Sequence, residues 1–347
     1  MNPSFQRLMA DAARLTQAGD LQLASAAIQA ALGGARVQPA GNEAGVIDVE
    51  AREVEIATAP PLHSVPHAGQ FIAASHTDAA GTREYKLYVP PGYRGQALPL
   101  VVMLHGCTQN PDDFAAGTRM NDAALECDFF VLYPAQAHKA NASRCWNWFQ
   151  PKHQQRDRGE PGLLAGMTRD VIKRYNIDPQ RVYVAGLSAG GAMAAILGDA
   201  YPDVFAAVGV HSGLPAGSAT DARTAFAAMK GGTVCAPQSG HTPPTIVFHG
   251  DQDTTVHPVN GEHVVAASAG AGTPELERAR SGNGRRYTRR TYRDAGGRVL
   301  AEHWAVHGCG HAWSGGSARG SYTDAKGPDA SREMLRFFFS HTLHTAR

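Results

Sequence analysis

Short apolar runs alternate with segments of helical spacing between residues 71 and 347. The apolar runs predict buried strands at 85–89, 100–104, 129–133, 181–185, 206–210, 245–249 and 299–306. Apolar positions at helical spacing predict helices at 162–175, 189–200 and 331–343. Because runs that are apolar throughout suit parallel strands covered on both faces, this order predicts a doubly wound, mostly parallel α/β sheet.

Residues 1–70 have a different pattern. Within residues 1–32, apolar positions at helical spacing lie on both sides of a break near Gly19, which predicts a helical hairpin. Residues 33–70 are rich in Ala, Gly and Pro without sustained periodicity, which is typical of a linker. We therefore expect a hairpin at 1–32, a linker at 33–70 and an α/β domain at 71–347.

Charge is nearly balanced, with 32 Lys and Arg against 31 Asp and Glu. A balanced chain has no global field to hold it on nucleic acid or an anionic membrane, so a neutral or modestly polar molecule, small or polymeric, is the expected partner. One basic cluster is interpreted as a solvated surface stretch. Its members are Arg285, Arg286, Arg289, Arg290 and Arg293.

The apolar runs also bear on location. None approaches the ~18 residues that a membrane-spanning helix needs. Asp11, Arg14 and Asp20 lie where a signal peptide would have its apolar stretch. The sequence therefore predicts neither a membrane span nor an export signal, and a cytoplasmic location is the default expectation.

The pentapeptide Gly186-Leu187-Ser188-Ala189-Gly190 is the one G-x-S-x-G motif of the chain. A predicted strand runs directly into it and a predicted helix leaves it, which is the context of a nucleophile elbow. In such an elbow the serine lies on a sharp turn, and the glycines avoid clashes with the neighbouring strand and helix. Ser188 is the candidate nucleophile, and the alternative is a glycine-rich turn with an idle serine.

A serine nucleophile needs a base and a carboxylate that orients the base, in the chain order Ser, Asp or Glu, then His. Asp251 and Asp253 both follow the predicted strand 245–249, and their order does not decide between them. His311 lies in a glycine-flanked loop after the last predicted strand, which favours it as the base. The competing histidines are His211, His241, His249, His257, His263, His303 and His307.

Backbone amides are the usual donors to the oxyanion of a tetrahedral intermediate. One is expected from Ala189, at the start of the helix after the nucleophile. The other is expected from the loop 104–109, and we place it at Cys107. His105 of the same loop is expected to hold the loop rather than to act in catalysis.

Metal and cofactor motifs are absent from the sequence. The five cysteines form no C-x-x-C pair, and their spacing does not match a zinc site. The chain has no H-E-x-x-H, Walker or dinucleotide motif after a strand. We therefore predict no metal and no cofactor.

Several motifs occur in the order typical of one family. They are Leu104-His105-Gly106-Cys107-Thr108-Gln109, Cys145-Trp146-Asn147-Trp148-Phe149, the segment 186–193, His249-Gly250 with Asp253 and Val256, and Gly310-His311-Ala312-Trp313. Over about residues 83–339 the chain resembles the poly(3-hydroxybutyrate) depolymerase family of esterases. The resemblance implies an α/β-hydrolase fold and hydrolysis of short-chain polyhydroxyalkanoate esters or oligomers through an acyl-enzyme on Ser188. It also implies Asp253, and not Asp251, as the triad acid.

The resemblance extends to the substrate groove and to the cysteines. The groove candidates are His105, Gln109, Trp146, Trp148 and Trp313, and the alternative for the tryptophans is packed core. The pairing Cys107–Cys145 is a hypothesis for a disulfide at the mouth of the site. A weaker hypothesis pairs Cys235 with Cys309 and leaves Cys127 as a buried free thiol.

Two alternatives to a polyester substrate stay open. Relatives of the family include feruloyl and acetylxylan esterases, so an aryl or acetyl ester is the first alternative. A non-catalytic binding protein on a decayed hydrolase fold is the second. Members of the family are often extracellular and carry a polymer-binding domain, which this sequence does not predict. The hairpin at 1–32 is expected either to dock on a polymer granule or partner protein, or to cap the main domain or form an oligomer contact.

Overall fold

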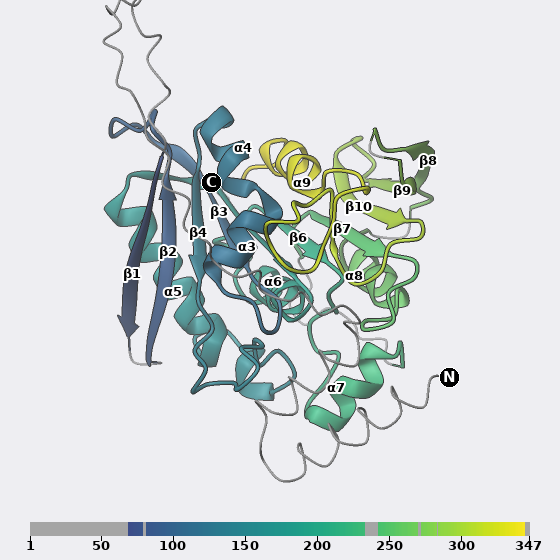
Figure 1. The fold of residues 1–347 in the computed structure, drawn as a ribbon, viewed down its shortest axis with the longest axis horizontal. Helices are drawn as coiled ribbons and strands as arrows, with labels where there is room; N and C mark the ends of the chain where they lie inside the picture. Colours follow the sequence, from purple (N-terminus) through teal and green to yellow (C-terminus); the bar gives the residue numbers. More distant parts are fainter. Residues whose placement is uncertain (1–68, 79–80, 233–241, 270–271, 283, 344–347) are drawn as a thin grey trace, which may run out of the picture. The chain divides into compact units, whose positions relative to one another are not determined.

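The computed structural model describes residues 69–78, 81–232, 242–269, 272–282 and 284–343. Ten strands within these ranges form a single sheet (Figure 1). Its spatial order is β1 (Gln70–Asp78), β2 (Gly81–Val89), β4 (Phe130–Pro134), β3 (Leu98–Leu104), β5 (Ile177–Leu187), β6 (Ala207–His211), β7 (Thr245–Gly250), β10 (Val299–Val306), β9 (Arg286–Arg293) and β8 (Glu275–Arg280). The central strands from β4 to β10 pair in parallel, and the outer strands at both edges pair antiparallel. The predicted doubly wound, mostly parallel α/β sheet is confirmed.

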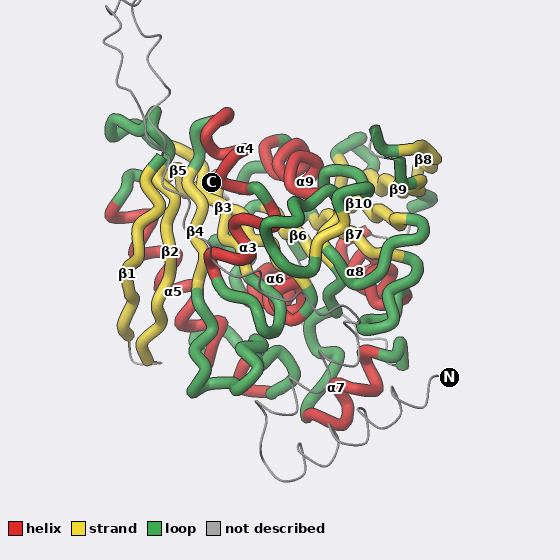
Figure 2. The backbone as a smooth tube through the Cα atoms, in the orientation of Figure 1, coloured by secondary structure: helices red, strands yellow, loops and turns green. Residues whose placement is uncertain are grey.

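Helices cover both faces of this sheet (Figure 2). One face carries α5 (Gly159–Arg174), α6 (Ala189–Ala200) and α8 (Val259–Ala269), and the other carries α3 (Pro111–Thr118), α4 (Met120–Cys127) and α9 (Ala330–Phe339). Strand β3 shows why both faces are apolar. Leu100 and Val102 lie in one core and Val101 and Met103 in the other, because successive side chains of a strand point to opposite faces.

Short elements complete the described chain. They are the 3-10 turn η1 (Pro151–His153), helix α7 (Ala222–Met229) and the two-residue strands β11 (Trp313–Ser314) and β12 (Thr323–Asp324). Strands β11 and β12 pair in parallel. They close the loop that follows β10 and precedes α9.

Every predicted strand overlaps an observed one, with ends that differ by a few residues. Strands β1, β8 and β9 were not predicted. Strands β8 and β9 read Glu-Leu-Glu-Arg-Ala-Arg and Arg-Tyr-Thr-Arg-Arg-Thr-Tyr-Arg, so they have no apolar run. The predicted hairpin at 1–32 and the linker up to residue 68 lie outside the described residues.

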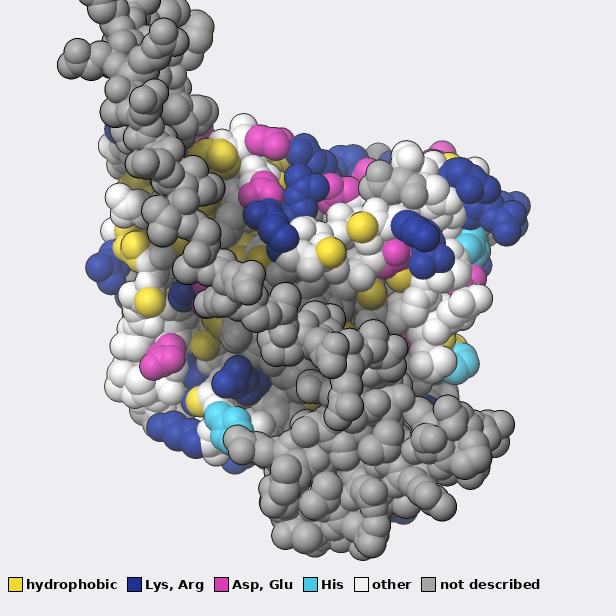
Figure 3. Space-filling view, in the orientation of Figure 1, with side chains coloured by type: hydrophobic (Ala, Val, Ile, Leu, Met, Phe, Trp, Pro, Cys, Tyr) yellow, Lys and Arg dark blue, Asp and Glu magenta, His cyan; other side chains and the backbone are white. Residues whose placement is uncertain are grey.

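The basic cluster lies at this polar end of the sheet, where Figure 3 shows Lys and Arg side chains gathered over β8 and β9. Its charges are partly matched locally. Arg289 pairs with Glu277, and the neighbouring Arg293 pairs with Glu275 at 3.5 Å. Ion pairs at or near the surface contribute little to stability but reduce the net charge of the surface. No helix of the described chain has both the length and the apolar character to cross a membrane.

The packing of α9 on the sheet gives a stability prediction. Phe338 is fully buried and its ring stacks on Tyr183 at 5.0 Å, so Phe338→Ala is expected to lower the free energy of unfolding by about 3–5 kcal/mol. Phe226→Ala is the matched control, because that ring is 70% exposed and its removal leaves no cavity. Urea unfolding measures both. Equal losses for the two variants would contradict this packing.

Candidate active site

Ser188 lies at the turn between β5 and α6. Its φ of 58° and ψ of −119° are rare for a residue with a side chain, and strain of this kind is common at functional sites. The turn is held because the Ser188 amide donates to the carbonyl of His211 on the neighbouring strand β6, at 2.9 Å. The observed strand, turn and helix have the geometry that a nucleophile elbow requires.

Asp253 and His311 meet because β7 and β10 are parallel neighbours, so the loops that follow them leave the same edge of the sheet. The Nδ1 of His311 lies 2.7 Å from Oδ2 of Asp253. A side chain on Gly250 would clash with the carbonyl of Cys309 and lie 2.6 Å from that of Gly310. Glycine at position 250 therefore lets the two loops approach closely.

The carboxylate of Asp253 is buried among donors. Its Oδ1 accepts from the amides of Thr255 and Val256, both at 2.9 Å, while Nε2 of His249 lies 3.4 Å from Oδ2. Burial by itself raises the pKa of the Asp253 carboxyl. The hydrogen bonds from His249 and His311 outweigh burial and hold this pKa well below its ordinary value. The group is thus a fixed negative charge beside His311.

The structure distinguishes Asp251 from Asp253, the two candidate acids that residue order alone left open. Asp251 is exposed and pairs with Nδ1 of His307 at 2.9 Å. Its other oxygen accepts from the amide of Gly308 at 2.7 Å. Asp251 therefore fixes the loop after β10, and Asp253 is the acid that contacts His311.

The turn after β3 lies against the elbow. A side chain on Gly190 would clash with the carbonyl of Leu104 and lie 2.6 Å from that of His105, so only glycine permits this approach. A Cβ on Gly106 would lie 3.6 Å from Cβ of Ser188. The two turns are thus in direct contact at the carboxyl ends of β3 and β5.

The amides of this turn are not equivalent. Gly106 donates to Oε1 of Gln109 at 2.9 Å, and Thr108 donates to the carbonyl of Ser143 at 2.7 Å. Within the described part of the chain, the Cys107 amide between them has no hydrogen-bond acceptor. The amide of Ala189 is the first of α6, so it also lacks an intrahelical acceptor. The amides of Cys107 and Ala189 are the two that the sequence predicts as oxyanion donors.

His105 and Gln109, two of the groove candidates, are buried supports of the turn. Nδ1 of His105 lies 2.7 Å from the carbonyl of Gly106, and Nε2 accepts from the amide of Gln136 at 3.1 Å. Burial lowers the pKa of His105 to about 4, so the ring is neutral and able to accept. Nε2 of Gln109 donates to Asp113 at 2.7 Å. Both side chains hold the loop, which is the role expected for His105 from the sequence.

The tryptophan candidates for the groove are packed core in the structure. Trp146 and Trp313 are buried, and Trp148 is 6% exposed. The indole of Trp146 donates to the carbonyl of His105, and that of Trp313 to the hydroxyl of Ser331. A Trp with its N–H satisfied inside the core offers no face to a substrate. The structure therefore favours the core alternative for all three.

Cys107 and Cys145 form a disulfide, the pairing that the resemblance implied. The second hypothesis pairs Cys309 with Cys235, which lies outside the described residues; Cys309 itself is a free thiol in the structure. Burial raises the pKa of the Cys309 thiol to about 12, and the neighbouring Asp324 adds to this effect. Cys127 is free but exposed rather than buried, because it is the last residue of α4.

Two histidines that competed with His311 also contact the site. His211 is fully buried at the end of β6, and its Nε2 accepts from the amide of Ser314 at 2.9 Å. Burial lowers its pKa to about 3, so the ring stays neutral. His249 lies at the end of β7 beside Asp253. Both histidines lie at the end of a predicted strand or directly after it, and this position is the sequence signal that could have placed them at the site. The signal does not distinguish a histidine that supports the site from a catalytic one.

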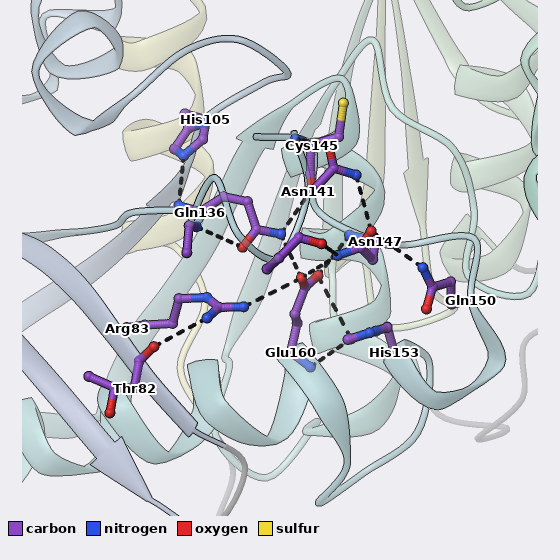
Figure 4. A network of polar contacts seen from close by, with 12 residues as sticks. Thr82, Arg83, His105, Gln136, Asn141, Cys145, Asn147, Gln150, His153 and Glu160 are labelled. Atoms are coloured by element: carbon purple, nitrogen blue, oxygen red, sulfur yellow. Dashed lines mark hydrogen bonds and ion pairs between the residues drawn. The ribbon is translucent and has the colours of Figure 1, made fainter. Parts of the chain in front are cut away.

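A buried carboxylate organises the loop that carries Cys145. Figure 4 shows Glu160 at the centre of the polar contacts, and it is 2% exposed. It accepts from Nε2 of Gln136 at 2.5 Å, and from the amide and Nδ2 of Asn147 at 2.7 and 2.8 Å. Gln136 in turn donates to the carbonyl of Cys145 and, through its amide, to His105. The network thus connects α5 to the turn beside Ser188.

In the described ranges, no group of three or more His, Cys, Asp or Glu side chains is arranged to hold a metal ion.

The chain is similar to known esterases. Residues 83–272 match the family model described as Esterase PHB depolymerase. Curated relatives include "Poly(3-hydroxyalkanoate) depolymerase C" of Paucimonas lemoignei, 33% identical over 65% of this chain and 57% of the relative. "Poly(3-hydroxybutyrate) depolymerase" of Ralstonia pickettii is 30% identical over 65% of this chain and 50% of the relative. The chain thus spans about half the length of these two relatives.

A solved structure extends the similarity to the fold. The acetyl xylan esterase from Aspergillus awamori superposes with a TM-score of 0.62 at 20% identity, over 78% of this chain and 99% of that chain. With the strand order and the elbow, this likeness shows the α/β-hydrolase fold that the resemblance implied.

The buried carboxylate gives a prediction for the loop network. Every near partner of Glu160 donates to it, so Glu160→Gln places an amide N–H against another donor and is expected to cost about 1–3 kcal/mol of unfolding free energy. Glu84→Gln on β2 makes the same change at an exposed position and should be neutral. Chemical denaturation compares the two variants. If Glu160→Gln left the free energy of unfolding unchanged, the proposed hydrogen-bond network would be contradicted.

The low pKa of Asp253 gives a pH prediction. Because folding lowers this pKa, the ionised group stabilises the fold fully above its unfolded pKa of about 4, and the contribution is lost as the pH falls below that value. Asp253→Asn should therefore lower the unfolding free energy at pH 7, and the deficit should shrink below pH ~4. Urea unfolding at several pH values measures this, with Asp128→Asn, at an exposed aspartate directly after α4, as control. A deficit independent of pH would refute the assignment.

Proposed function

Because the chain belongs to the esterase PHB depolymerase family, whose model matches more than half of it, we propose that it is a serine hydrolase of carboxylic esters. The contact between His311 and Asp253, at 2.7 Å, carries this proposal. Both residues follow strands on the same side of β5, whose elbow presents Ser188. A neutral imidazole oriented by a carboxylate is the base that a serine nucleophile needs.

In the proposed reaction, the Oγ of Ser188 attacks the ester carbonyl carbon while its proton passes to Nε2 of His311. Asp253 accepts a hydrogen bond from Nδ1–H of His311, which leaves Nε2 as the proton acceptor, and its charge stabilises the imidazolium that forms. The amides of Cys107 and Ala189 stabilise the oxyanion. His311 then returns the proton to the leaving alcohol, and an acyl-enzyme remains on Ser188. Water activated by His311 releases the acid and restores the serine.

For the substrate we propose short-chain hydroxyalkanoate esters or oligomers, since relatives with 33% and 30% identity carry depolymerase names. A second candidate is an acetyl ester of a polysaccharide. The acetyl xylan esterase structure favours this candidate, because the superposition covers 99% of that chain. The sequence matches to the two depolymerase relatives cover only about half of their lengths. Comparing hydroxybutyrate oligomers with acetylated xylan distinguishes the two.

The disulfide between Cys107 and Cys145 favours an oxidising compartment, because cytosolic proteins rarely keep structural disulfides. The default expectation of a cytoplasmic protein is therefore not supported. Docking on a granule or partner through residues 1–32 concerns residues outside the described ranges, and it stays a prediction.

Removal of the nucleophile tests the proposal. Ser188→Ala should lower kcat for p-nitrophenyl acetate, p-nitrophenyl butyrate and hydroxybutyrate oligomers at least about a thousandfold, because no acyl-enzyme can form. Ser340→Ala, an exposed serine after α9, is the matched control and should keep full activity.

Two outcomes would overturn it. If Ser188→Ala keeps full activity, Ser188 is not the nucleophile. If the natural chain hydrolyses none of these esters, the binding-protein alternative replaces the esterase.

A further inference from the structure

The tryptophans nominated for the groove are buried, so the apolar wall of a substrate site must come from other residues. Tyr322 is 46% exposed, one of the few large apolar side chains of the described chain that is so open to solvent. Its φ is 51°, in the left-handed region that bulky residues rarely adopt. Such a conformation costs free energy and persists only where the surrounding structure holds it.

The backbone around Tyr322 is held on both sides. Its carbonyl accepts from the amide of Trp313 at 2.7 Å, which joins β11 to the start of β12. The preceding Ser321 donates to Asp113 on α3, through its amide at 2.8 Å and its hydroxyl at 2.5 Å. Gln109 also donates to Asp113. The segment that carries Tyr322 is thus fixed to the same residues that hold the turn after β3.

The hydroxyl of Tyr322 reaches that turn directly. It lies 3.1 Å from Oγ1 of Thr108, which itself donates to the carbonyl of Cys107 at 2.6 Å. Because the Thr108 proton is used in that bond, Tyr322 is the donor of the pair. Thr108 is next to the proposed oxyanion donor Cys107, and Gly106 of the same turn lies against Ser188. The exposed ring therefore lies beside the turn that carries the proposed oxyanion donor.

We propose that Tyr322 is a specificity-determining residue whose ring forms the apolar wall of the ester site beside the oxyanion turn. The ligand class is an ester with an apolar chain or ring beyond the carbonyl carbon, on its acyl or its alcohol side. An aromatic face of this kind binds aliphatic and aromatic groups, while the hydroxyl fixes the ring. This inference rests on the proposed esterase activity and adds the surface that selects among esters.

Selectivity within two substrate series tests the proposal. One series compares p-nitrophenyl butyrate with acetate, and the other compares phenyl acetate with ethyl acetate. Tyr322→Asn replaces the aromatic ring with a small side chain, and Asn tolerates a positive φ. Tyr322→Phe keeps the ring and removes only the hydroxyl. Leu276→Asn is the matched control, because Leu276 is also 46% exposed but lies on the edge strand β8.

We expect Tyr322→Asn to lower the kcat/KM preference for the larger ester in at least one series by about tenfold, mainly through KM. Tyr322→Phe and Leu276→Asn should keep both preferences. Unchanged preferences in Tyr322→Asn would overturn the proposal, as would an equal loss in Tyr322→Phe, which would leave the hydroxyl alone responsible. If Tyr322→Asn does not fold, Tyr322→His replaces the phenol with a smaller polar ring that also tolerates a positive φ, and it should lower the same preference. Ser188→Ala measured in parallel separates these outcomes from failure of the esterase proposal itself.

Discussion

The site depends on one contact in which two backbones meet without a side chain between them. Gly190, in the elbow after β5, lies against the carbonyls of Leu104 and His105 at the end of β3. A side chain there would push the turn after β3 away from Ser188, together with the amide of Cys107. The strained backbone of Ser188 persists because the sheet on one side and α6 on the other fix both ends of the turn. The proposed nucleophile and the proposed oxyanion donors are therefore positioned by the same packing.

Buried hydrogen-bonded carboxylates hold the loops that carry these site residues. Glu160 connects α5 to the turn after β3 through Gln136 and His105, and the disulfide at Cys107 fixes the turn covalently to the loop that Glu160 organises. Asp253 is held in the same way, by backbone amides and by His249. Each of these carboxylates is buried because donors surround it, and in both cases burial reduces the freedom of a loop at the site.

The sequence predicts the parts of the molecule that depend on local pattern. The central strands were predictable because each is an apolar run. The turn at Ser188 and the approach of Asp253 to His311 were predictable because the pentapeptide, the residue order and the family motifs indicate them. Strands β8 and β9 were not predictable from apolar runs, because they pair through alternating charged side chains at the edge of the sheet. Pattern also does not distinguish a buried Trp from one that lines a groove. Tyr322 stands in a polar loop with no periodicity, so only the structure connects it to Thr108.

The most direct test of the account is to react the native chain with a fluorophosphonate and to identify the modified residue by peptide mass spectrometry. A serine activated by a neighbouring base reacts much faster than an ordinary hydroxyl. We expect one adduct, on Ser188, and slow labelling in a His311→Ala variant that retains its fold. An adduct on another serine, or equal labelling of Ser188 without His311, would contradict it.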